Sequence, residues 1–185
     1  PLLKFFLKQE LIKVPVMGAA WWALDFPFMK RYSKAYLEKY PEKRGQDLET
    51  TRKACEKFRD MPTSVMNFLE GTRFTQRKHD EQQSPFNYLL KPKAGGMAFA
   101  MSAMGEQFRS VLDVTIYYPQ GIPTFWDFLQ GKMQRCTVLV NEIAIPQELR
   151  NGDYETDEQY RLNFQLWVQQ LWEAKDQQLA QLHNA

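Results

Sequence analysis

The sequence contains few of the residues from which common catalytic and structural centres are built. Its 185 residues include two cysteines, Cys55 and Cys136, and two histidines, His79 and His183. The cysteines follow no metal-ligand spacing, so the sequence predicts neither a metal site nor a disulfide framework, and it favours a reducing compartment. No phosphate-binding loop or dinucleotide fingerprint is present, and we therefore expect no bound cofactor.

Long apolar runs and a strong charge imbalance are also missing. No segment reaches the ~18 to 20 uninterrupted apolar residues that span a bilayer as a helix. The formal net charge of +2 is too small for the basic surface of a nucleic-acid-binding protein, so we expect no nucleic-acid partner. With 44% apolar residues the chain can bury one sizeable core, and we expect a single domain over residues 1–185.

Strand-like and helix-like segments alternate along the first half of the chain. Apolar, β-forming runs occur at 2–7, 26–31 and 65–69, and segments with helical spacing lie between them at 19–24 and 48–58. This order predicts an α/β fold with one mixed, mostly parallel sheet flanked by helices.

The second half of the chain adds further elements. The highly polar segment 75–84 predicts a solvated loop, and the β-branched segments 111–118 and 136–145 predict strands. The connection 121–131 is too apolar for a free loop, and we expect it to pack a helical turn onto the domain.

The C-terminal segment predicts one long amphipathic helix. Thr156 and Gln159 have the spacing of a capping box at its start. We expect an inward apolar face with Tyr160, Phe164, Trp167, Leu171 and Leu179. The residues expected in water are Lys175, Asp176, Gln177 and Gln178.

One short run places polar and flexible residues directly after a strand. Glu70, Gly71, Thr72 and Arg73 follow the apolar segment 65–69, and open α/β sheets bind ligands at the carboxyl ends of their strands. Glycine permits a tight turn, threonine offers a hydroxyl, and arginine offers a planar fork of donors for carboxylate or phosphate. Glu70 either orients that fork or forms a simple surface ion pair with Arg73.

This run also carries a family resemblance. Residues 68–73, with the sequence F-L-E-G-T-R, resemble the F-P-E-G-T-R block of the glycerolipid acyltransferases, the 1-acylglycerol-3-phosphate acyltransferase family, with Leu69 in place of proline. Residues 14–18, leading to 28–31, resemble the family's second block, whose glycine and terminal arginine help to form the acceptor site.

A third block is similar to one subgroup of the family. The segment 91–96 and the strand 112–119 resemble the lysophospholipid acyltransferases that carry D-V-T-x-x-Y-P. Many relatives have proline within this strand where Val114 stands here, so no site residue is taken from the block.

The resemblance implies an enzyme that transfers an acyl group from acyl-CoA or acyl carrier protein to a lysophosphatidate-like glycerolipid in phospholipid synthesis. It further implies a lysophospholipid acceptor and a location at the cytoplasmic face of a membrane. The implied substrate-binding residues are Gly18, Arg31, Glu70, Gly71, Thr72 and Arg73. Arg31 and Arg73 are expected to converge on the acceptor phosphate, while Lys91 and Lys93 either extend this basic field or lie in a solvated loop.

The family's H-x-x-x-x-D motif, in which the aspartate orients a histidine base, is not found. Ser84 stands five residues after His79, and no residue stands that far after His183. We expect both histidines to be solvated and no catalytic residue within this chain. We also expect that the domain is truncated and that the motif precedes Pro1. A non-catalytic lipid- or phosphate-binding module that has lost the base is the alternative.

Two apolar clusters each allow two roles. Trp21 and Trp22, near Lys30 and Lys34, either belong to a core helix or form a patch for a membrane surface. A stripe at helical spacing after Gly96 either faces the core or lines a channel for an acyl chain. Its members are Met97, Met101, Met104 and Phe108.

Overall fold

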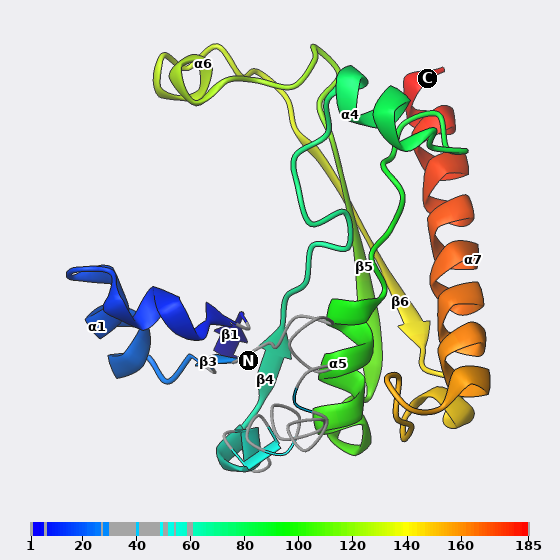
Figure 1. Ribbon diagram of the computed structural model, residues 1–185. Coiled ribbons are helices and arrows are strands. Elements are labelled where there is room, and N and C mark those ends of the chain that lie inside the picture. Colours follow the sequence, from blue (N-terminus) through cyan, green and yellow to red (C-terminus); the bar gives the residue numbers. More distant parts are fainter. Residues whose placement is uncertain are drawn as a thin grey trace.

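The computed structural model describes residues 2–5, 7–26, 28–29, 40, 49, 52–53, 55–58 and 61–184. Helices and strands are mixed along one chain, as the α/β prediction requires (Figure 1). The strands in this described part form three two-stranded sheets instead of one continuous sheet. Two sheets are parallel, in agreement with the predicted crossover connections, and the third is an antiparallel hairpin.

The parallel sheets are built from the N-terminal third of the chain. β1 (Leu2–Lys4) pairs with β4 (Thr63–Val65), and β2 (Leu7–Lys8) pairs with β3 (Phe28–Met29). The predicted helix at 19–24 is confirmed as α1 (Met17–Ala23), which connects β2 to β3.

Parts of two predicted elements lie outside the described residues. Of the predicted helix 48–58 the structure describes isolated positions and the 3-10 turn η3 (Glu56–Phe58). Arg31, Lys30 and Lys34 lie outside the described residues.

The remaining strands and helices follow in the second half of the chain. β5 (Ser110–Tyr117) and β6 (Thr137–Ala144) form the hairpin and confirm the two predicted strands. The helical elements are η1 (Gln9–Lys13), α4 (Gln76–Gln82), α5 (Gly95–Met104), η4 (Gly105–Gln107), α6 (Phe125–Leu129), η5 (Gln147–Leu149) and α7 (Glu158–His183).

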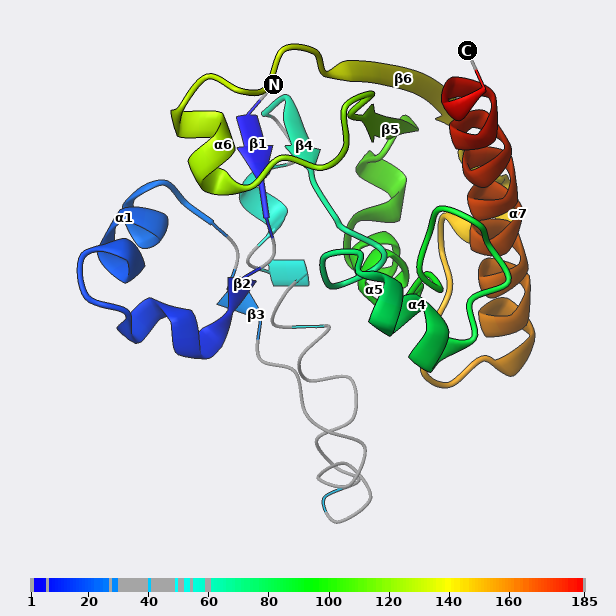
Figure 2. The same cartoon turned by 90° about the horizontal axis from the view of Figure 1, so that it is seen from above.

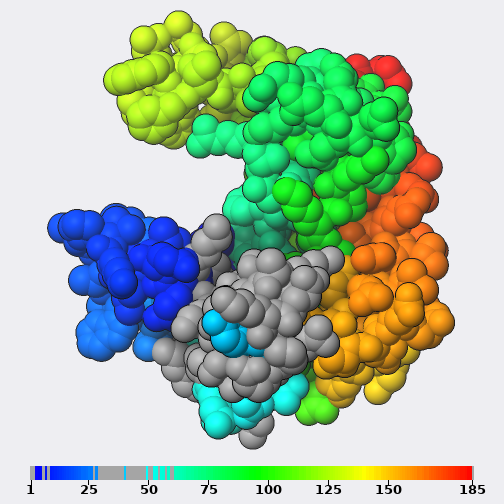
Figure 3. Space-filling model, in the orientation of Figure 1, coloured from blue at the N-terminus to red at the C-terminus, as the bar shows by residue number. Residues whose placement is uncertain are grey.

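The elements are arranged around the long helix α7. It runs along the β5–β6 hairpin on one side of the molecule, with α4 near its C-terminal end (Figures 1 and 2). The helices α1 and α6 project from the opposite side, in separate places. The space-filling view shows a hollow between them (Figure 3).

The core lies mainly between α5 and α7. Ala98 and Met101 of α5 pack in one cluster with Phe164 and Val168 of α7. Met104 is also buried, beside Phe58, and Met97 and Phe108 pack against these clusters as partly buried side chains. The methionine stripe therefore faces the core, the first of its two predicted roles.

The hairpin has one covered and one open face. Odd-numbered residues of β5, such as Asp113 and Thr115, face α7, and Thr115 is only 3% exposed. Even-numbered residues point the other way, so that Val114 pairs with Val140 and Ile116 with Val138 on an exposed apolar face. This alternation is the period of two expected of a half-covered strand.

The prediction of a loop over 75–84 is wrong, because α4 occupies most of it. The Thr75 hydroxyl accepts a hydrogen bond from the Lys78 backbone N–H at 3.3 Å and caps the helix. Gln76 and Asp80 are hydrogen-bonded one turn apart, at 2.8 Å. Capping, side-chain pairs and good helix formers stabilise this short helix without an apolar stripe, which is why hydrophobic periodicity missed it.

The start of α7 differs by one residue from the predicted capping box. Asp157 is the N-cap, and its side-chain oxygen accepts a hydrogen bond from the Tyr160 N–H at 2.9 Å. The inward apolar face is confirmed, with Tyr160, Phe164 and Leu179 buried. Aspartate is as good an N-cap as threonine, so the sequence alone left two competing starts.

The prediction that Lys175 and Asp176 lie in water is wrong, since each is only 8% exposed. The Lys175 ammonium group lies 2.7 Å from the Asp113 carboxylate and donates to the Val114 carbonyl at 2.9 Å. It also donates to the Thr115 hydroxyl at 2.9 Å, and that hydroxyl donates to Gln178. A buried ammonium group with this set of partners ties α7 to β5.

Asp176 ties α7 to a different segment of the chain. Its two carboxylate oxygens accept hydrogen bonds from the backbone N–H groups of Asn87, at 3.0 Å, and Tyr88, at 2.8 Å. The indole N–H of Trp172 donates to the Leu90 carbonyl at 2.9 Å. We call residues 86–90 the anchor segment, because α7 fixes it at both ends.

Replacing Asp176 by alanine is expected to lower the free energy of unfolding by about 2 to 4 kcal/mol, because two partly buried N–H groups lose their acceptor. Asp176→Asn keeps one acceptor oxygen and should lose less. Urea unfolding followed by circular dichroism measures both. The neighbouring Gln177 is exposed, so Gln177→Ala is the matched control; an equal loss in that variant would contradict the assigned role of Asp176.

Candidate functional site

The candidate site is a turn between β4 and α4. The Gly71 N–H donates to the Phe68 carbonyl at 2.9 Å, and Gly71 has a φ of +66°. A residue with a side chain is strained at this positive φ, so the turn depends on glycine. We call residues 70–73 the Glu70–Arg73 turn; it precedes the first turn of α4. The prediction of a strand over 65–69 directly before it is wrong for most of that segment, because β1 pairs only with residues 63–65 and β4 ends at Val65. Residues 66–68 are exposed and lie outside any strand.

Three basic side chains belong to or surround this turn. The Lys78 ammonium group donates to the Thr72 hydroxyl at 2.6 Å and to the Arg73 carbonyl at 3.1 Å. A Cβ atom placed on Gly71 would lie 3.5 Å from the Lys93 ammonium nitrogen, so Lys93 lies against the turn. Arg73 itself is exposed. The Lys93 N–H also donates to the Leu69 carbonyl at 2.7 Å, which joins the two segments.

The sequence reasoning missed Lys78 and left Lys93 undecided between two roles. Lys78 lies on α4, which the sequence predicted as a loop. No helical spacing therefore indicated that its side chain lies next to Thr72. Both lysines are exposed; the Lys93 side chain lies against Gly71, whereas the backbone N–H of Lys91 bonds to Gln82. The N-cap residue Thr75 is the sequence feature that could have predicted the helix, and with it the position of Lys78, six residues after Thr72.

Glu70 faces the anchor segment. Its carboxylate accepts a hydrogen bond from the Leu90 N–H at 3.0 Å. Among the described residues, Glu70 forms no ion pair with Arg73. Burial raises the pKa of the Glu70 carboxyl above its ordinary value, while the hydrogen bond from Leu90 and the charge of Lys175 act in the opposite direction. The side chain therefore fixes the turn in place.

Gly18 lies in another part of the structure. It is buried in the first turn of α1, where an added Cβ atom would come within 2.1 Å of the Ile12 carbonyl oxygen. Close packing of α1 on η1 therefore requires glycine. In both ribbon views α1 lies apart from the connection between β4 and α4 (Figures 1 and 2). The predicted convergence of Arg31 and Arg73 stays a prediction, because Arg31 is outside the described residues.

His79 is not solvated, contrary to prediction. Its Nε2 atom lies 2.6 Å from the Phe86 carbonyl oxygen and its Nδ1 atom 3.3 Å from the Asp80 carboxylate, with 17% of the side chain exposed. The hydrogen bond to the Phe86 carbonyl, followed by that to Asp80, raises the pKa of the imidazole. His79 thus joins α4 to the anchor segment.

His183 is exposed as predicted, but its ring has partners. It stacks on the Tyr88 ring at a centroid distance of 4.3 Å and meets the Tyr117 ring edge-on at 4.8 Å. The ring contacts fasten the end of α7 to the anchor segment and to β5.

Two kinds of feature are absent from the described residues. They contain no group of three or more histidine, cysteine, aspartate or glutamate side chains that could hold a metal ion. None of the described helices combines the length and apolar character needed to cross a bilayer.

Comparison with known proteins places this arrangement in a family. The sequence model of the family described as Acyltransferase matches residues 1–119, which include the Glu70–Arg73 turn. The chain is 25% identical over 184 residues to 1-acyl-sn-glycerol-3-phosphate acyltransferase gamma of Mus musculus, covering 94% of this chain and 44% of that protein. It is 24% identical to the delta protein of Homo sapiens, covering 94% of this chain and 43% of that protein.

The match to these relatives covers nearly all of this chain but only part of each relative. The delta protein of Rattus norvegicus is 27% identical over the same share of this chain and 43% of its own length, so the chain spans less than half of these relatives. No solved structure matches the chain. The family match nevertheless covers well over half of the residues, from β1 through the turn to the end of β5. The chain therefore belongs to the acyltransferase family.

Proposed function

We propose that the Glu70–Arg73 turn binds the phosphate of a lysophosphatidate-like acceptor, and that this chain serves acyl transfer to that acceptor in phospholipid synthesis. The observation that carries the proposal is that the ammonium groups of Lys78 and Lys93 lie against the exposed turn to which Arg73 belongs. The names of the relatives, which are 1-acyl-sn-glycerol-3-phosphate acyltransferases, support the same acceptor class. The acyl donor is acyl-CoA or acyl carrier protein.

The turn offers several kinds of contact to a phosphate. The exposed Arg73 side chain provides a planar fork of charged donors, which suits two phosphate oxygens at once. The Thr72 hydroxyl accepts a hydrogen bond from Lys78, so its own proton is available for a phosphate oxygen. Gly71 lets a ligand approach the backbone closely, since it has no side chain.

The role of the chain in this proposal is to bind and position the acceptor. His79 has both ring nitrogens engaged, by Phe86 and by Asp80, and His183 is stacked on tyrosine rings. Removal of the proton from the acceptor hydroxyl is therefore assigned to neither histidine, and we assign no catalytic residue within this chain. Binding of the phosphate would hold the free hydroxyl of the glycerol backbone in a fixed place beside the turn.

Replacing Arg73 by lysine is expected to weaken binding of a short-chain lysophosphatidate about tenfold to a hundredfold, because a point charge replaces a two-point contact. Arg73→Ala should weaken it further, and neither variant should change binding of a monoacylglycerol without phosphate. Isothermal titration calorimetry below the micellar concentration measures these affinities.

Arg77 provides the matched control for this experiment. It is exposed on α4 and pairs with Glu81 at 3.6 Å, so Arg77→Lys should bind lysophosphatidate as the wild type does. Unchanged affinity in both Arg73 variants would remove the phosphate role of the turn. Thiol release from acyl-CoA, measured on the same samples, separates an enzyme from a module that binds the lipid without turnover.

Glu70→Gln is expected to raise the urea midpoint at neutral pH. Because burial raises the folded-state pKa of Glu70, the folded protein holds this proton more tightly than the unfolded chain does, so stability is lost as the pH rises through the folded-state pKa. Glutamine keeps an acceptor for the Leu90 N–H and has no charge to bury.

The gain from Glu70→Gln should disappear when the pH falls below the ordinary glutamate pKa of 4.5. Urea midpoints of wild type and variant at neutral and acidic pH test this difference. Glu70→Leu, which removes the acceptor, should be less stable than Glu70→Gln at both pH values. A lower midpoint for Glu70→Gln at neutral pH would show that the charge of Glu70 stabilises the turn.

A further inference from the structure

The connection between β5 and β6 carries large apolar side chains that no core accounts for. We call residues 119–136 the α6 arm, after the short helix at its centre. Phe125 and Trp126 are each 69% exposed. The other exposed apolar residues of the arm are Ile122, Phe128 and Leu129. The sequence correctly predicted a helical turn here, but the expectation that it packs onto the domain is wrong.

The short helix of the arm is capped by its own hydrogen bonds. The Asp127 carboxylate accepts hydrogen bonds from the Thr124 hydroxyl at 2.6 Å and the Thr124 N–H at 3.1 Å, while the Asp127 N–H returns one to the Thr124 hydroxyl at 3.1 Å. Gly121 and Gly131 adopt positive φ on either side of α6, at +90° and +69°. The apolar side chains are thus presented on a defined scaffold, and little ordering remains to be done on binding.

Two basic side chains follow α6 on the arm. Lys132 lies 3.3 Å from the Asp127 carboxylate, and Arg135 is exposed without an ion-pair partner among the described residues. Both border a shallow cavity of about 180 Å³ that Gly121 and Ile122 also line. Two cations and one anion give this part of the arm a net positive charge. Exposed aromatic rings beside cations complement an anionic lipid surface, where rings lie among the headgroups and cations contact the phosphates.

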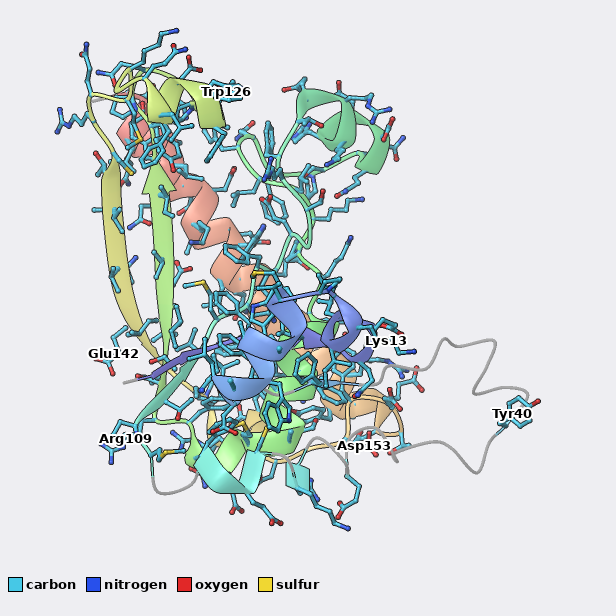
Figure 4. The ribbon with its side chains drawn as sticks, turned by 90° about the vertical axis from the view of Figure 1, so that its left-hand side faces the viewer. Lys13, Tyr40, Arg109, Trp126, Glu142 and Asp153 are labelled. Atoms are coloured by element: carbon cyan, nitrogen blue, oxygen red, sulfur yellow. The ribbon has the colours of Figure 1, made fainter. Side chains whose placement is uncertain are left out.

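The position of the arm favours a flat, extended partner. Figure 4 shows Trp126 on α6, beyond the end of the β5–β6 hairpin. The α1 helix projects from the same side of the molecule (Figures 1 and 2) and carries Trp22, which is 68% exposed. The space-filling view shows the connection between β4 and α4 at the back of the hollow between these two projections (Figure 3).

We propose that the α6 arm docks this side of the protein on an anionic phospholipid bilayer. Phe125, Trp126, Phe128 and Leu129 enter the interface between headgroups and acyl chains, and Lys132 and Arg135 contact lipid phosphates. Trp22 of α1 meets the same surface. This interaction does not rest on the proposed acceptor binding at the Glu70–Arg73 turn, because it uses different residues and needs no turnover.

Vesicle flotation of the full chain tests the docking. The vesicles are phosphatidylcholine with phosphatidylserine, and phosphatidylcholine alone. Wild type should float with the anionic vesicles, less so at high salt. The double variant Phe125→Ser with Trp126→Ser should lower the partition coefficient at least about tenfold, since two large apolar side chains are lost from the interface. Lys132→Gln and Arg135→Gln should each lower it about fivefold on anionic vesicles and hardly at all on neutral ones.

The controls come from the opposite side of the molecule. Leu162 and Leu166 of α7 are 48% and 57% exposed, so Leu162→Ser with Leu166→Ser removes a comparable exposed apolar surface and should leave flotation unchanged. Because all of these side chains are exposed, each variant should keep the wild-type urea midpoint. Flotation that is absent in the wild type, or that the control variant lowers as much as the arm variant, would overturn the proposal. So would a dimer in light scattering that the arm variant abolishes while vesicle binding persists.

Discussion

The hydrogen bonds from the anchor segment to the buried carboxylate of Asp176 are the constraint on which the candidate site depends. Asp176 accepts two backbone N–H groups of the anchor segment, and Trp172 bonds to its last residue from one turn earlier on the same helix face. The anchor segment in turn holds Glu70 through Leu90 and His79 through Phe86. The position of the turn therefore depends on α7 through four side chains, the carboxylates of Asp176 and Glu70 and the rings of Trp172 and His79.

The acidic and basic side chains of the turn have separate roles: Glu70 holds the turn in place, and Arg73 and Lys78 give it a positive charge. Glu70 is directed to the anchor segment and is partly withdrawn from solvent, whereas Arg73 is exposed. Because Lys78 binds the Thr72 hydroxyl and the Arg73 carbonyl, its ammonium group keeps the charge at the turn without an acidic partner there among the described residues. A carboxylate beside Arg73 would have competed with an incoming phosphate, and the structure avoids this competition.

Sequence patterns predicted the elements whose stability is local or strongly periodic. The β-branched alternation of β5 and β6, the core-facing methionines of α5 and the glycine turn before Arg73 could be predicted, because each follows from a regular period or from glycine. The burial of Lys175 could not be predicted in this way, although Lys175 lies three residues after Trp172 and four before Leu179, on the apolar face of α7. Its charge suggested water. Its burial is made tolerable by partners on β5 that lie far away in the sequence, the Asp113 carboxylate, the Val114 carbonyl and the Thr115 hydroxyl. The exposure of the α6 arm could not be predicted either, since an apolar run gives no information on whether the rest of the chain covers it.

The anchoring of the turn also has a consequence for the order of folding. Asp176 is separated from Asn87 by 89 residues and Trp172 from Leu90 by 82. Contacts between such distant parts of a chain form late, because a long loop must close before they stabilise anything. During synthesis the segment that contains Gly71 leaves the ribosome well before α7 does. The hydrogen bonds from α7 that position the anchor segment therefore cannot form until the last helix has been made. The Glu70–Arg73 turn is thus synthesised early and folds late. A nascent chain that ends before α7 would contain the residues of the turn but not the contacts that hold them in place.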